Sequence, residues 1–201
     1  MTAKTLLMVT ACVSALLTAA CAEIRYPKYY VLNVVPTRMP GTGDAHRSLA
    51  VAVRRFDSPD YLRQGRIVYR ETPGEIGFYD YHRWAADPGA TITTAMIDAL
   101  RSARLFSVVV PYDGREQQEC VLSGRLERLD EIDYGGGVRV EARLLAELVN
   151  RRTGETLWTG DASETSNIET RTVGSVVDAM SHAVETSIDR LVASMEQQLP
   201  R

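Results

Sequence analysis

The alternation of apolar and polar residues is strongest in the second half of the chain. Across residues 138–149 every second residue is apolar, and most of the residues between them are charged. A period of two places one row of side chains on a buried face and the other row in solvent, which predicts a strand of a half-buried sheet. The glycine-rich segment 135–137 and the segment 150–154 predict turns to flanking strands at 120–134 and 155–164.

The pattern of the strand predicted at residues 120–134 changes phase along its length. Leu122, Leu126 and Ile132 share one parity and would face inward together, whereas Leu129 has the opposite parity. Either Leu129 faces the other side of the sheet or a β-bulge shifts the pattern, and both alternatives stay open at this point. Cys120 is followed by two apolar residues and is predicted to be buried in this strand.

Two segments have the 3.6-residue period of amphipathic helices. The first starts at Asp87-Pro88, a capping carboxylate followed by a proline in the first turn. The second starts at Thr172, or at Ser175 with Asp178 completing a capping box. The apolar stripe of the first helix consists of Ile92, Ala95, Met96, Ala99, Leu100 and Ala103. That of the second consists of Val173, Val176, Val177, Met180, Val184, Ile188, Leu191, Val192 and Met195.

Short strands and one loop are predicted in the first half of the chain. The loop is residues 36–48, which have two prolines, two glycines and no apolar period. The strands are predicted at residues 29–35, 49–53, 67–69, 76–81 and 106–110. Strands, a helix, a meander and a last helix predict a single α+β domain, with a mostly antiparallel or mixed sheet and two main helices packed on it.

A short apolar run precedes this domain and has the pattern of a secretory signal. Lys4 is followed by a mostly apolar segment at residues 5–17, small residues at 18–20, and Cys21. The run is too short to remain as a membrane-spanning helix, which needs about 20 residues. The small residues before a cysteine resemble a bacterial lipobox, in which the cysteine is acylated and becomes the new N-terminus. Thr18 stands where that pattern usually has leucine. Cys12 is a rival acylation site, and secretion without acylation is the remaining alternative.

The domain organisation follows from this interpretation. Residues 1–20 are expected to be a cleaved signal peptide, residues 21–28 an acylated tether and residues 29–199 the folded domain. Removal of Lys4 with the signal leaves 22 basic residues (23 minus 1) and 26 acidic residues. This balance lacks the basic surface that nucleic acid requires. With Cys21 acylated, Cys120 has no partner for a disulfide within the chain.

The sequence predicts no catalytic site, no cofactor and no metal site. None of His46, His82 and His182 has neighbours that form a triad or metal pattern, and no phosphate-binding glycine motif is present. The acidic group at residues 130–133 lacks the spacing of a calcium loop and is interpreted as a solvated strand edge. His182 is predicted to lie on a helix surface.

Residues 58–84 are rich in large side chains without a simple period. One interpretation is core aromatic residues accompanied by solvated arginines. The other is a contact surface for a partner or a second copy, because tyrosine, tryptophan and arginine are enriched at interfaces. Trp84 is expected to lie toward the core and Arg70 toward the surface. The candidate contact residues are Tyr61, Leu62, Tyr69, Arg70 and Trp84.

The order of these features resembles the ABC-type transport auxiliary lipoproteins, the lipoprotein components of Mce-type and paraquat-inducible lipid transport systems. The resemblance covers residues 29–199. It is carried by Tyr30-Val31-Leu32, the strand at 51–56, Pro59, Tyr61-Leu62, Ile67-Val68-Tyr69-Arg70, Arg83-Trp84 before Asp87-Pro88, and the long hairpin with its terminal helix.

The resemblance implies a non-enzymatic accessory subunit on the periplasmic face of the outer membrane. Its implied partners are the membrane, through N-terminal acyl chains such as palmitate, an Mce-domain protein with the ABC permease and ATPase, and further copies of the chain. Ala22 after Cys21 favours the outer membrane, because aspartate at that place retains lipoproteins in the inner membrane of enteric bacteria. The alternative is a structural or regulatory outer-membrane lipoprotein of envelope assembly.

Overall fold

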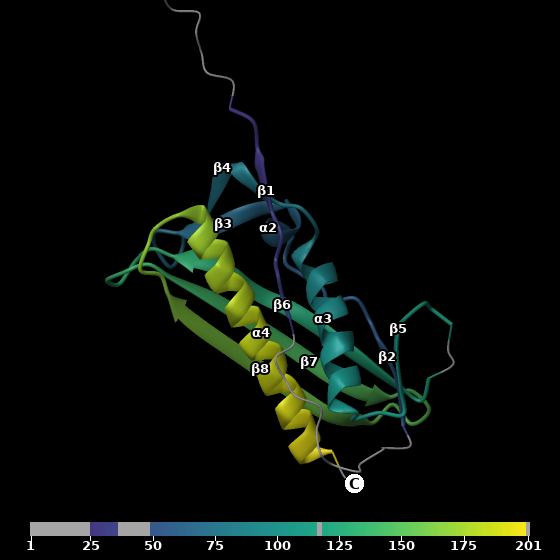
Figure 1. Ribbon diagram of the computed structural model, residues 1–201. Coiled ribbons are helices and arrows are strands. Elements are labelled where there is room, and N and C mark those ends of the chain that lie inside the picture. The colour runs from purple at the N-terminus through teal and green to yellow at the C-terminus, as the bar shows by residue number, and fades with distance from the viewer. Residues whose placement is uncertain (1–24, 36–48, 116–117, 200–201) are drawn as a thin grey trace, which may run out of the picture.

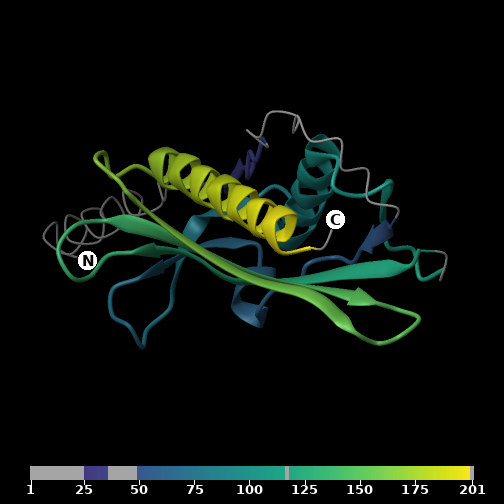
Figure 2. The same ribbon diagram turned by 90° about the horizontal axis from the view of Figure 1, so that it is seen from below.

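The computed structural model describes residues 25–35, 49–115 and 118–199, which form one mixed sheet with two long helices on one face (Figure 1). The helices are α3 (Pro88–Ala103) and α4 (Val173–Gln198), and a short helix α2 (Asp60–Arg63) lies on the other side of the sheet (Figure 2). The expected α+β fold is therefore confirmed. The signal peptide, Cys12, Cys21 and the loop 36–48 lie outside the described residues.

The long central strand β6 (Cys120–Ile132) connects the two halves of the sheet. Along one side it pairs with β7 (Arg139–Asn150), which pairs in turn with β8 (Thr156–Asn167), and all three are antiparallel. The other strands are β1 (Lys28–Tyr30), β2 (Ala50–Val53), β3 (Arg66–Arg70), β4 (Gly77–Trp84) and β5 (Val108–Pro111). On its other side β6 pairs in parallel with β2 near Cys120 and with β3 near Ile132. The order of strands along this path is β1-β4-β3-β6-β2-β5.

A β-bulge explains the change of phase in β6. Leu126 lies opposite Leu144 and Arg128 lies opposite Arg143, so Glu127 is an extra residue. Beyond the bulge Leu129 faces the helices with Leu122 and Leu126, and all three side chains are fully buried. The expectation that Ile132 shares their face is wrong, because Ile132 lies opposite Arg139 on the other side of the sheet.

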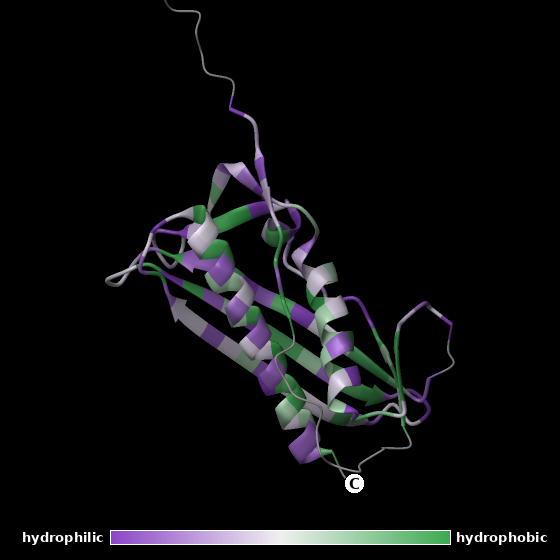
Figure 3. Cartoon of the chain, in the orientation of Figure 1, coloured by the Kyte–Doolittle hydropathy of each residue, from purple (hydrophilic) through white to green (hydrophobic). Residues whose placement is uncertain are grey.

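Each long helix starts with a side-chain cap and places its apolar stripe on the sheet. The Asp87 carboxylate accepts a hydrogen bond from the Ala90 N–H at 2.8 Å, and the Thr172 hydroxyl accepts one from the Ser175 N–H at 3.1 Å. The second helix therefore starts after Thr172 and not at Ser175. Figure 3 shows apolar and hydrophilic residues alternating along β6, β7 and β8 below the helices.

Two glycines in the sheet make room for aromatic rings beneath the helices. A Cβ atom on Gly124 would lie 2.3 Å from the Phe56 ring, and one on Gly160 would lie 2.3 Å from the Trp158 ring. Gly124 and Gly160 both pair with Ala146, so small residues form one row across three strands. This row lets two large rings pack close to the backbone.

Several shorter elements differ from the prediction in length. The first strand ends at Tyr30 and not at residue 35, although the alternation continues, with Leu32 buried and Val31 exposed. The strand predicted at 106–110 begins at Val108, after a buried Phe106. The buried strand around Val51 and the hairpin of β3 and β4 agree with the prediction. In the described part of the chain, no helix combines the length and apolar character needed to cross a bilayer.

Candidate functional site

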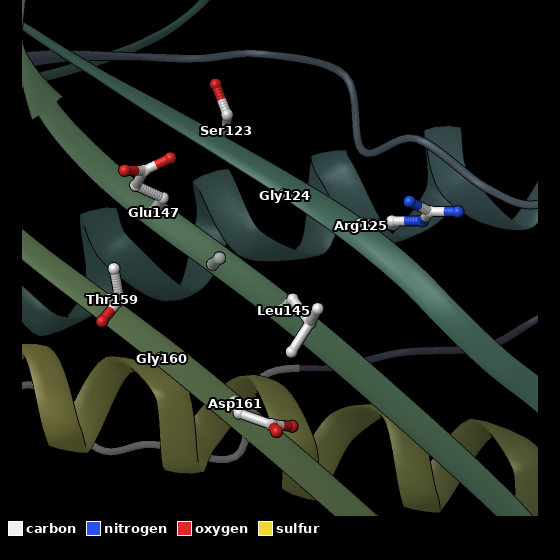
Figure 4. A pocket seen from close by; sticks show the side chains of 9 residues that line it. Ser123, Gly124, Arg125, Leu145, Glu147, Thr159, Gly160 and Asp161 are labelled. Atoms are coloured by element: carbon white, nitrogen blue, oxygen red, sulfur yellow. The ribbon is translucent and has the colours of Figure 1, made fainter.

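The face of the sheet opposite α3 and α4 is open along β6, β7 and β8 (Figure 2). Two hollows lie on this open face, and Arg125 lines both of them. The larger, of about 710 Å³, is lined by Ser123, Gly124, Arg125, Leu145, Ala146, Glu147, Thr159, Gly160 and Asp161 (Figure 4). The smaller, of about 250 Å³, is lined by Pro59, Tyr61, Arg70, Arg125, Glu127 and Arg128.

Ion pairs connect neighbouring strands across the open face. Arg143 of β7 pairs with Asp161 of β8 at 2.6 Å and lies 3.6 Å from Glu127 of β6. Arg128 of β6 pairs with Glu141 of β7 at 2.8 Å. Arg125, by contrast, forms no ion pair within the described ranges. Its guanidinium is therefore available to an acidic group of a partner.

A buried ion pair lies at the end of the smaller hollow. Asp130 is fully buried, and its carboxylate accepts a hydrogen bond from the Arg70 guanidinium at 2.5 Å. Arg70 also stacks over the Tyr61 ring, with the guanidinium carbon 5.6 Å from the ring centroid. Burial raises the pKa of Asp130, and the Arg70 charge opposes that shift. Burial together with the charge of Asp130 raises the pKa of Tyr61 to about 12.

The next residue carries a second buried carboxylate on the opposite face of the sheet. Glu131 accepts a hydrogen bond from the Tyr79 hydroxyl at 2.7 Å, and the Arg171 Nε atom lies 3.8 Å from its other oxygen. The Tyr79 ring packs edge-on against the rings of Tyr69 and His82, with centroids 5.2 and 5.6 Å apart. Burial raises the pKa of Glu131 above its usual value.

The acidic group at residues 130–133 is therefore not the solvated strand edge that the sequence suggested. Asp130 and Glu131 are both fully buried, and they face opposite sides of the sheet because they are neighbours in one strand. The carboxylates cannot converge on one ion. Across the described residues, no group of three or more histidine, cysteine, aspartate or glutamate side chains is placed to hold a metal.

Replacing Glu131 by glutamine is expected to increase the stability of the protein at neutral pH. The pKa of Glu131 is higher in the folded protein than its unfolded value of about 4.3. Such a carboxyl group stabilises the fold fully at pH values below the unfolded pKa. This stability is lost as the pH rises through the folded pKa. Glutamine keeps the acceptor for Tyr79 without a buried charge. Urea unfolding of both proteins from pH 4 to pH 8 should show a difference that is largest at neutral pH and vanishes in acid.

Asp161 provides a control for which the pH dependence of stability has the opposite sign. The hydrogen bond from Arg143 lowers the pKa of Asp161, so its contribution is present at neutral pH and is lost as the pH falls through the folded pKa. Asp161→Asn should therefore lose a small amount of stability, and at neutral pH only, because solvent screens this exposed ion pair. A Glu131→Gln protein that is less stable at pH 7 would mean that attraction to Arg171 outweighs the cost of burial.

The structure separates the candidate contact residues into buried and partly exposed groups. Leu62 is fully buried and Trp84 is 5% exposed, so neither is available on the surface. Arg70 was expected toward the surface, but its side chain is only 11% exposed because it pairs with Asp130. Tyr61 lines the smaller hollow, and Tyr69 is half-buried beside Tyr79. Of these candidates, the structure leaves Tyr61, Tyr69 and, to a smaller extent, Arg70 partly accessible.

Sequence reasoning missed the larger hollow. Leu145, at its centre, follows Arg139, Glu141 and Arg143 in the solvent-facing row of β7. A leucine in a charged row was the available signal of a contact position on the open face. Its partners in the hollow, Arg125 and Asp161, pair directly with it across β6 and β8, and that register becomes visible only in the folded sheet.

The fold is a sheet with helices on one face and an open, charge-lined surface on the other. The chain belongs to the family of ABC-type transport auxiliary lipoprotein components, whose family model matches residues 30–196. The resemblance stated from the sequence is thereby confirmed. Curated protein sequences provide no match to this chain.

Solved structures share the fold at low sequence identity. Protein XCC0632 from Xanthomonas campestris is 17% identical, with a TM-score of 0.74, and the match covers 85% of this chain and 97% of that one. A PelC dodecamer from Paraburkholderia phytofirmans is 18% identical, with a TM-score of 0.50, and the match covers 80% of this chain and 96% of that one. At these identities the likeness shows the fold alone.

Proposed function

We propose that the protein is a non-enzymatic accessory lipoprotein of an Mce-type ABC transport system that moves lipids between the inner and outer membranes. The observation that carries this proposal is the family match over residues 30–196, which includes every strand from β2 to β8, α3 and nearly all of α4. In this proposal Cys21 is the acylated residue, and Ala22 after it favours the periplasmic face of the outer membrane as the location of the domain.

The open face of the sheet is the docking surface that we assign to this function. It combines a leucine-centred hollow, a row of paired charges and Arg125, which has no ion pair among the described residues. Two occupants fit the proposal, the Mce-domain protein or a neighbouring copy of the chain. The dodecamer formed by PelC supports self-association of this fold.

Replacing Leu145 by glutamate is expected to weaken association with the Mce-domain protein or with further copies. The change places a carboxylate in the larger hollow beside Asp161 and Glu147, and truncated interface anchors typically cost about 2 kcal/mol or more. The acylated full chain should be purified in detergent, and its mass and any bound Mce-domain protein measured.

A matched control is Ile76→Glu, which changes an exposed apolar residue of the loop between β3 and β4. Normal melting with reduced association for Leu145→Glu alone supports the docking surface. Recovery of cell-wall synthesis proteins in place of the Mce-domain protein contradicts the transport proposal and favours envelope assembly.

A further inference from the structure

Exposed apolar side chains gather in the segment that leads from the predicted anchor into the domain. Seven large apolar residues are exposed in the described ranges, and four of them lie within residues 25–35. These four are Tyr26, Tyr29, Val31 and Val35, with exposed fractions of 76, 63, 66 and 60%. In Figure 1 the segment containing the first of them leaves the domain beside β1 and β4.

The inward-facing residues of this segment hold the outward-facing residues in place. The Tyr30 hydroxyl lies 2.9 Å from the His82 Nδ1 atom, and the Tyr30 carbonyl accepts a hydrogen bond from the Ala85 N–H at 2.8 Å. Leu32 is buried in the core, and the next N–H donates to the Ser181 hydroxyl at 3.1 Å. The alternate side chains of Tyr29 and Val31 are therefore presented to the outside from an anchored backbone.

The composition of the segment matches a phospholipid surface. Residues 25–35 contain two cations, Arg25 and Lys28, and no acidic residue. Tyrosine favours the boundary between acyl chains and water because it combines an apolar ring with a polar hydroxyl. Lysine and arginine near this boundary are attracted by anionic lipids.

The distance to the anchor places this segment close to the bilayer. Cys21 is four residues before Arg25, and an extended chain spans at most about 3.3–3.6 Å per residue, or about 14 Å in total. An acylated Cys21 therefore holds Arg25 within about 14 Å of the lipid. β5 lies at the opposite end of the path through the strands from β1.

We propose that Tyr26, Tyr29 and Val31, flanked by Arg25 and Lys28, form a second membrane contact that rests on the phospholipid surface. This inference relies on the acyl anchor at Cys21 from the proposed function. The acyl chains hold the protein at the membrane, and the second contact sets the orientation of the domain. The end of the domain at β1 and β4 faces the membrane, and β5 lies away from it. The proposal assigns these residues to lipid and not to another protein.

The test compares two labelled positions on the acylated full chain in vesicles of phosphatidylethanolamine and phosphatidylglycerol. Val31→Cys and Val108→Cys each receive an environment-sensitive fluorophore, and Val108 of β5 is the control because it is also exposed. Cys120 is fully buried and remains unlabelled, and the thiol of Cys21 is blocked by the acyl group. Lipids with a quencher near the headgroup should quench the label at position 31 at least severalfold more than that at position 108.

A second set of variants tests the tyrosines themselves. Tyr26→Ser with Tyr29→Ser should reduce quenching of the label at position 31 by at least half, while the melting temperature stays unchanged. Equal quenching at positions 31 and 108 overturns the proposal. A label at position 31 that is shielded only when a second copy or the Mce-domain protein is added also overturns it.

The experiments distinguish an error in the proposed anchor at Cys21 from an error in the proposed membrane contact. Mass spectrometry of the mature protein should show acyl groups on Cys21, and Cys21→Ala, with Cys12 retained, should abolish processing and membrane attachment. An unacylated Cys21 contradicts the proposed anchor. An acylated Cys21 with a solvent-exposed label at position 31 contradicts only the membrane contact.

Discussion

Replacing Arg70 by alanine is expected to lower the free energy of unfolding by about 3–5 kcal/mol, because it leaves a buried carboxylate without its partner. Asp130 is fully buried, and Arg70 provides its direct hydrogen bond, whereas the Arg128 Nε atom is 4.0 Å away. The second oxygen of Asp130 already lacks a hydrogen-bond partner among the described residues. Urea unfolding monitored by circular dichroism measures the loss.

Two further variants separate the effect of charge burial from that of lost packing. Arg143→Ala removes an exposed ion pair with Asp161 and should change stability little, because solvent screens such pairs. Arg70→Met with Asp130→Leu removes both charges and should recover most of the stability. If the double variant is as unstable as Arg70→Ala, the lost contact of Arg70 with Tyr61, and not the unpaired charge, explains the effect.

Replacing Trp84 by alanine is expected to cost about 3–5 kcal/mol, because truncating a buried tryptophan leaves a cavity in the core. Trp84 is 5% exposed and is the last residue of β4. Its backbone N–H donates a hydrogen bond to the Gly65 carbonyl at 2.8 Å. For a domain of this size, such a loss lowers the melting temperature by about 10 °C. Scanning calorimetry of the purified protein measures the change directly.

Tyr81 is the matched control for Trp84. It lies three residues earlier in β4 and is 43% exposed, so Tyr81→Ala should leave the melting temperature nearly unchanged. A Trp84→Ala protein that melts normally but loses association would restore Trp84 as a contact residue. The expected result distinguishes the side chains of residues 58–84 that belong to the core from those that lie on the surface.

Local patterns in the sequence were sufficient to predict the elements that follow one simple rule of periodicity or capping. β7 alternates strictly, so its buried row of Val140, Ala142 and Leu144 could be read directly. The cap at Asp87 uses a side chain whose hydrogen bond lies within one turn, whereas the structure decided between Thr172 and Ser175 as the start of α4. Such features depend on residues three or four positions apart, and their physical cause is fully contained in the local sequence.

Only the tertiary structure decided the features that depend on pairing between distant strands. The bulge at Glu127 follows from the register of β6 with β7, and it decides which face of the sheet Asp130 occupies and which face Glu131 occupies. Arg70 belongs to a strand that pairs with β6 in parallel, 60 residues away from Asp130, so its burial could not be read from its own neighbours.

The sequence by itself determined the two helices, the meander and the family resemblance, because these depend on local order and composition. The anchor motif was also read from the sequence and stays a prediction. The open face of the sheet was decided by the fold, since it exists only after α3 and α4 cover the other face. Its hollows combine residues from β3, β6, β7 and β8 and from the segment around α2. The register of hydrogen bonds between strands, and not any local propensity, brings Arg125, Leu145 and Asp161 together.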